Sequence, residues 1–270
     1  MGVLKGHFVV FESQEVHKNG LKSIIMNNDT VSEPIVSVIE NKKVDHRIRI
    51  ANFPPDPESR LDSMEMKWKP IYDATIPFRD LTNPDTKKES YFKLIEKLNV
   101  EKSIRYQKTI EDTYCNVYTF DYCYFSKVYV PTIWWKEDAL QKILNGEEVP
   151  VIYGETVDHI YSSAIHDWFL QWGVSFGWKR MYSVDEMQSQ VNTNAGVGII
   201  CAKRKIKGLS GHIVPVVPES DLHQAYRENG VVRYPLQSQA GKLNFNYFSK
   251  EKEAWWEDEL YSSYVFYYHD

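Results

Sequence analysis

Residues 197–217 read VGIICAKRKIKGLSGHIVPVV, and this stretch decides the fold class. Its two apolar, β-branched runs, residues 197–202 and 212–217, are typical of strands. The segment between them is basic and ends in KGLSG, which favours a turn rather than a crossover helix. Further strand-like runs follow at residues 231–239 and 264–268. The last third of the chain therefore predicts neighbouring antiparallel strands.

Upstream of these strands, the apolar residues recur at helical spacing. Asp112 or Thr113 is placed to cap a helix that follows it, and Gly173 is placed to stop another. The predicted helices cover residues 89–98, 113–125, 157–172 and 185–191. Helices followed by a run of strands, without βαβ alternation, predict an α+β domain.

The first part of the chain has a different character. Residues 7–16, 34–39 and 44–50 are β-type runs, and residues 52–57 (NFPPDP) form a stiff polar connector. A second break, LTNPD, follows at residues 81–85. We therefore expect a small β-rich N-terminal module over residues 1–85 and a second domain over residues 86–270.

Charge and composition exclude several classes of protein. The net charge is −5, and the one compact basic run, residues 203–207, is too short to make a nucleic-acid surface. No run of 18 apolar residues predicts a membrane span, and no apolar segment at the start resembles a signal peptide. Aromatic residues reach 14%, and many of these rings suit wet grooves as well as cores.

The chain has three cysteines, so at least one thiol is free. No CxxC pair is present, and we expect neither a metal site nor a cofactor. Cys115 is the sharpest candidate for chemistry because it lies at the expected start of the helix over residues 113–125. The helix dipole and the free N–H groups there stabilise a thiolate and can hold an oxyanion. The alternative is a small buried side chain.

A cysteine nucleophile needs a base, and His212 follows Gly211 at the start of a predicted strand. A third group must then orient the imidazole. Gln239 stands at the end of the next predicted strand, and Glu219 is an alternative carboxylate seven residues after His212. Spacing alone does not choose between them.

Six segments in order resemble the bacterial and phage cysteine peptidoglycan hydrolases of the NlpC-type and CHAP amidase group. The segments cover about residues 90–270. They are Arg105–Tyr106 with TYCNVY at 113–118, Asp121 and Pro131; AIHDWF…G…FGW at 164–178; NTNAG at 192–196; GHIVPVVP at 211–218; QAGKLNF at 239–245; and VFYYH at 265–269. Tyr118 replaces the usual Phe, and Lys203–Arg204 stands where Lys-Asn is common.

The resemblance implies a papain-like α+β fold with Cys115 as nucleophile, His212 as base and Gln239 as the third catalytic residue. We expect Tyr114, Trp178 and the Trp134–Trp135 pair to line a substrate groove. The implied activity is cysteine-dependent hydrolysis of a peptidoglycan amide, either in the stem peptide or at the muramoyl–alanine bond.

Two alternatives remain open from the sequence. The same cleft could belong to a catalytically idle module that binds wall fragments or a partner, or to an injected amidase acting on a rival bacterium or a host amide. For the main hypothesis we expect action outside the cytoplasm, in the periplasm or at the cell wall. The sequence leaves the oligomeric state open.

Overall fold

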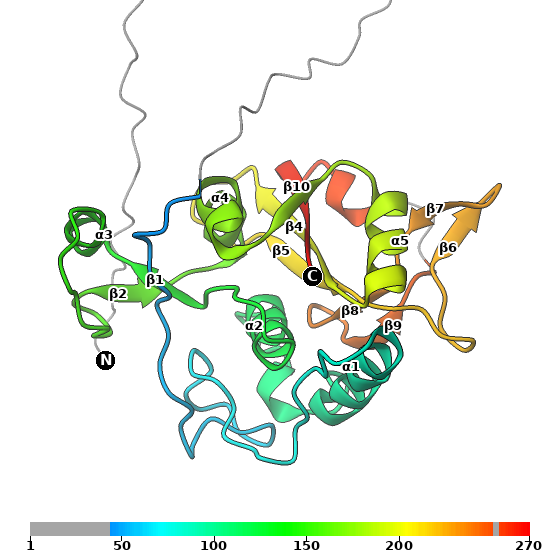
Figure 1. The fold of residues 1–270 in the computed structure, drawn as a ribbon, viewed down its shortest axis with the longest axis horizontal. Coiled ribbons are helices and arrows are strands. Elements are labelled where there is room, and N and C mark those ends of the chain that lie inside the picture. The colour runs from blue at the N-terminus through cyan, green and yellow to red at the C-terminus, as the bar shows by residue number, and fades with distance from the viewer. Residues whose placement is uncertain (1–43, 251–253) are drawn as a thin grey trace, which may run out of the picture. The chain divides into compact units, whose positions relative to one another are not determined.

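A computed structural model describes residues 44–250 and 254–270 (Figure 1). Residues 43–270 form one compact unit, so residues 44–85 belong with the helices and sheet that follow them rather than with a separate part of the chain. The β-runs expected at residues 7–16 and 34–39 lie outside the described residues. At residues 44–50 the structure has a turn instead of the expected strand, because the Asp45 carboxylate accepts a hydrogen bond from the Arg47 N–H at 3.0 Å.

The centre of the unit is a six-stranded sheet in the order β3-β10-β4-β5-β8-β9, with every pairing antiparallel. Its strands are β3 (Lys179–Met181), β4 (Val197–Arg204), β5 (His212–Val216), β8 (Gln237–Gln239), β9 (Phe245–Phe248) and β10 (Tyr261–His269). Two small sheets pair β1 (Ile133–Trp135) with β2 (Val157–His159), and β6 (Tyr226–Glu228) with β7 (Val231–Tyr234). The predicted α+β class is therefore confirmed.

The helices are α1 (Pro84–Leu98), α2 (Cys115–Phe125), α3 (Glu137–Leu144), α4 (Ser162–Trp172) and α5 (Val184–Asn194), with 3₁₀ turns η1 (Ile104–Tyr106), η2 (Gly173–Phe176) and η3 (Trp255–Glu257). Alternate residues of the central strands face two cores. On one face Ile199 and Cys201 join α1, α2 and α4 in one cluster, and on the other Ile200 and Ala202 pack with α5.

Three predicted elements differ from the structure. Residues 157–159 belong to β2 rather than to the helix, because they pair with β1. The run at residues 231–239 divides at Pro235 into β7 and β8, which lie in different sheets. α4 ends at Trp172 with Gly173 as its C-cap, as predicted, but Gly173 has a φ of −48° rather than the left-handed conformation of a C′ glycine, and the chain continues as η2 until Gly177, which has a φ of +85°.

Candidate active site

The N-terminus of α2 carries Cys115 as its first residue. Neither Asp112 nor Thr113 caps it: the N-cap is Tyr114, and no side chain makes a capping hydrogen bond there. Asn83 caps α1 and Ser183 caps α5 through their side chains, whereas α3 and α4, like α2, have no side-chain cap. The first N–H groups of α2 are thus left without a capping side chain, and free N–H groups at a helix start can hold an oxyanion.

His212 reaches the site from the first residue of β5. The strand must approach β4 closely at this point, because a Cβ on Gly211 would lie 1.9 Å from the carbonyl oxygen of Ala202. The loop before His212 is also tied to α4, since the Ser163 hydroxyl donates to the carbonyl of Leu209 at 2.9 Å. Glycine at 211 is therefore required by packing, and it places the histidine.

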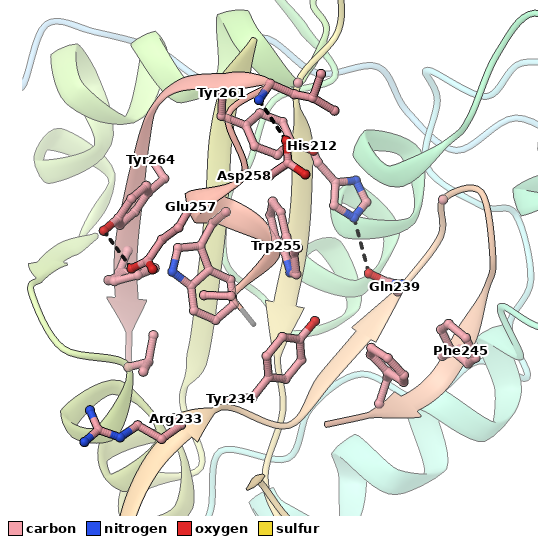
Figure 2. A pocket seen from close by; sticks show the side chains of 18 of the residues that line it. His212, Arg233, Tyr234, Gln239, Phe245, Trp255, Glu257, Asp258, Tyr261 and Tyr264 are labelled. Atoms are coloured by element: carbon pink, nitrogen blue, oxygen red, sulfur yellow. Dashed lines mark hydrogen bonds between the residues drawn. The ribbon is translucent and has the colours of Figure 1, made fainter. Parts of the chain in front are cut away.

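Gln239 is the third member of the site. The imidazole Nε2 of His212 lies 3.3 Å from the Gln239 Oε1, as Figure 2 shows. The other candidate, Glu219, is occupied elsewhere: its carboxylate pairs with Arg227 at 2.6 Å and accepts the N–H of Ala225. The structure thus brings Gln239, and not Glu219, to His212. With Nε2 held by Gln239, Nδ1 is the ring nitrogen left to exchange a proton with Cys115.

The thiol and the imidazole shift each other's pKa. Burial alone would raise the pKa of Cys115, but the charge of His212, with hydrogen bonds from His212, Ser162 and the Ile213 backbone, lowers it. Burial would lower the pKa of His212, but its interactions with Cys115 and Gln239 raise it. Both shifts act in the direction that stabilises a thiolate–imidazolium pair.

At the other two cysteines burial is the largest influence on the pKa, and at Cys123 it outweighs the charge of Arg79, which acts to lower the pKa. All three thiols are free, and burial raises the pKa of both Cys123 and Cys201. Cys115 is therefore distinguished from them by its surroundings and not by its burial, since it is itself only 2% exposed.

A cavity of about 1350 Å³ opens beside His212 and Gln239. Trp255, from η3, stands at the wall of the cavity beside His212 (Figure 2), and the two ring centroids are 4.7 Å apart. The Trp255 Nε1 donates to the side chain of Gln237 at 2.9 Å. Tyr261 and Tyr264 continue the wall along β10. Thr113 also lines the cavity, so the cavity reaches the segment just before Cys115.

The residues expected to line a groove do not line this cavity. Trp178 is 1% exposed, and its indole N–H donates to the carbonyl of Tyr129 at 2.8 Å, so it is a core residue. Trp134 packs edge-on against Trp168 at 5.7 Å in an aromatic cluster. Tyr114 is half-buried beside Cys115. None of the three lines the cavity, because their rings are used in packing around α2 and α4.

Sequence reasoning missed two neighbours of the pair. Ser162 Oγ lies 3.2 Å from Cys115 Sγ, but the residue falls inside a stretch that was predicted to be a continuous helix. Trp255 belongs to a Trp–Trp pair whose members both line the cavity: Trp255 is partly exposed, and Trp256 is 2% exposed. The two adjacent tryptophans are the sequence signal that could have pointed to this wall of the cavity, but they do not indicate His212 as a neighbour.

Comparisons with protein-family models, curated proteins and solved structures gave no match. Among the described residues, no helix has the length and apolar character needed to cross a membrane. Within residues 44–250 and 254–270, no three His, Cys, Asp or Glu side chains converge as ligands of one metal ion would.

Gln239 offers a test of the site that depends on pH. We expect Gln239→Ala to lower kcat/KM by about tenfold to hundredfold, because the imidazole loses the group that orients it. The Gln239 hydrogen bond also helps to raise the pKa of His212. Its loss lowers that pKa, so the alkaline limb of the pH–rate profile moves to lower pH.

The matched variant is Gln239→Glu, which keeps an acceptor and adds a negative charge. We expect its alkaline limb to move in the opposite direction, to higher pH. Identical alkaline limbs in the two variants would show that residue 239 does not act on His212.

Proposed function

We propose that this chain is a cysteine-dependent amide hydrolase with a papain-like arrangement of helix and sheet. The observation that carries the proposal is the placement of Cys115 at the uncapped start of α2 together with the opposite pKa shifts of Cys115 and His212. The resemblance of residues 90–270 to cysteine peptidoglycan hydrolases supports peptidoglycan as the substrate. Such a substrate implies action in the periplasm or at the cell wall.

The first half of the reaction uses the pair as it stands. His212 takes the proton of Cys115, and the thiolate attacks the carbonyl carbon of the amide. The carbonyl oxygen becomes an oxyanion that accepts hydrogen bonds from the free N–H groups at the start of α2. The C–N bond then breaks as His212 gives its proton to the leaving amine, and a thioester on Cys115 remains.

The second half regenerates the enzyme. His212 takes a proton from water, the hydroxide attacks the thioester carbonyl, and the C–S bond breaks to release a carboxylic acid. The sulfur leaves as the thiolate that its surroundings already stabilise. Gln239 holds the imidazole in one orientation through both halves.

The low exposure of Cys115 favours a second candidate, a catalytically idle module that binds wall fragments or a partner in the cavity beside His212. The two functions differ in whether a small reagent reaches a reactive thiol. The idle module needs no thiolate and no path to Cys115.

Selective alkylation separates these functions. We expect iodoacetamide at pH 7 to label Cys115 at least about tenfold faster than Cys123 or Cys201, since rate follows thiolate content and access. Peptide mass spectrometry of the full chain gives the three rates. Equal labelling, or none at Cys115, would support the idle module. For a reactive protein, mass spectrometry of fragments released from purified sacculi identifies the bond that is cut.

A further inference from the structure

A lysine lies under the residue that precedes the nucleophile. Lys67 is 8% exposed, and its Nζ is 2.9 Å from the ring centroid of Tyr114. Among the described residues, this Nζ has no hydrogen-bond partner. Burying an amine without a hydrogen bond costs folding free energy, so another interaction must offset this cost.

The backbone of Lys67 is fixed relative to α2. The guanidinium of Arg105 donates to the carbonyl of Lys67 at 3.0 Å and, through Nε, to Asp121 on α2 at 2.7 Å. Both Arg105 and Asp121 are fully buried. The backbone of Lys67 is therefore held in place relative to α2, while its amine meets the ring of Tyr114.

We propose that Lys67 is a positioning residue for the nucleophile. Its ammonium group, held on the face of the Tyr114 ring, fixes this N-cap residue of α2. It thereby positions the thiol of Cys115, the next residue. This inference rests on the proposed function, because it assigns Lys67 a part in the work of that thiol. Cation–π attraction supplies the contact, since an ammonium over a ring face is attracted and a neutral amine is not.

The charge of Lys67 changes near neutral pH. Burial, and then the charge of Arg105, lower the pKa of Lys67 to about 7, while Asp112 and Asp121 act in the opposite direction. These are the charged groups that face the amine, together with the ring of Tyr114. The hold on Tyr114 is therefore present below about pH 7 and weakens above it.

The test is the alkylation rate of Cys115 by iodoacetamide between pH 5.5 and 9, measured on the full chain by peptide mass spectrometry. In the unchanged protein we expect an inflection near pH 7, with a thiolate-corrected rate about threefold lower above it. Lys67→Arg keeps the charge and should hold the low-pH rate throughout. Lys67→Met keeps the stem and should hold the high-pH rate throughout.

One control variant at Lys69 and one pair of variants at Tyr114 make the result specific. Lys69→Met removes a neighbouring amine that pairs with Asp56 at 2.6 Å, and it should keep the inflection. Tyr114→Phe keeps a ring under which Lys67 can lie, so it should also keep the inflection near pH 7. Tyr114→Leu removes the ring and should abolish this inflection. The Tyr114 pair still decides the matter if Lys67→Arg fails to fold by circular dichroism.

The outcomes also separate this inference from the proposed function. No alkylation of Cys115 at any pH would overturn the proposed function. A reactive Cys115 whose inflection near pH 7 survives in Lys67→Met would overturn the role of Lys67 and leave the hydrolase intact. Titration of His212 acts through the thiolate content of Cys115, for which every rate is corrected.

Discussion

Cys115→Ala should abolish amide hydrolysis, with a fall in kcat of at least about 10³-fold, because no other group can form the thioester. Cys115→Ser should lose a similar factor. A serine hydroxyl can occupy the same place beside Ser162 and His212, but at neutral pH it is far less ionised than the thiol. The measurement is the release of soluble fragments from purified sacculi.

The controls are the other two cysteines. Cys123→Ala lies on the same helix and Cys201→Ala on β4, and both should keep the rate within about twofold. Thermal unfolding by circular dichroism must show that each variant is folded under the assay conditions. Hydrolysis that persists undiminished in folded Cys115→Ala protein would refute the cysteine mechanism.

The sequence predicts much of this site because its chemistry depends on local signals. A cysteine at an expected helix start and a Gly–His pair at a strand start are both visible in the residues, and the structure places Cys115 and His212 at those positions. The choice between Gln239 and Glu219 is not local. It depends on the pairing of β5 with β8, where Val216 lies opposite Gln237, and this pairing brings Gln239 alongside His212.

Non-local pairing also explains the failures. Residues 157–159 fit a helical pattern, but β1 supplies strand partners from 22 to 26 residues upstream, and backbone pairing overrides the local preference. Aromatic rings are a second case. A tryptophan in a sequence does not reveal which way its ring points, and Trp178 points into the core while Trp255 faces the cavity.

The absence of a capping side chain on α2 connects the local signals with the chemistry. Sequence reasoning expects a helix to be capped, and both Asp112 and Thr113 are suitable types. In the structure Tyr114 occupies the N-cap position and contributes no side-chain acceptor. A capping carboxylate would compete with an oxyanion for the same N–H groups, so stability given up at this helix end is consistent with catalysis there.

Arg105→Met should destabilise the fold by about 3–5 kcal/mol, because it leaves the Asp121 carboxylate buried without its cation. Both side chains are 0% exposed, and two hydrogen bonds of 2.7 and 3.1 Å join them. Tyr106 donates to the same carboxylate at 3.0 Å. Removal of Arg105 leaves this hydroxyl as the remaining side-chain donor recorded for Asp121. Urea unfolding followed by circular dichroism measures the loss.

The double variant Arg105→Met/Asp121→Leu distinguishes a paired charge from simple loss of packing. It removes both charges together, so we expect it to recover at least about half of the stability lost by Arg105→Met alone. A double variant as unstable as the sum of the two single variants would show that the pair is not coupled.

Arg105 and Asp121 both belong to the segment that resembles the hydrolase family, and neither reaches the thiol. Their shared role is to anchor α2. Arg105 also donates hydrogen bonds to the Ser59 hydroxyl and to the carbonyls of Lys67 and Lys69. The anchored helix can then present Cys115 at its N-terminus.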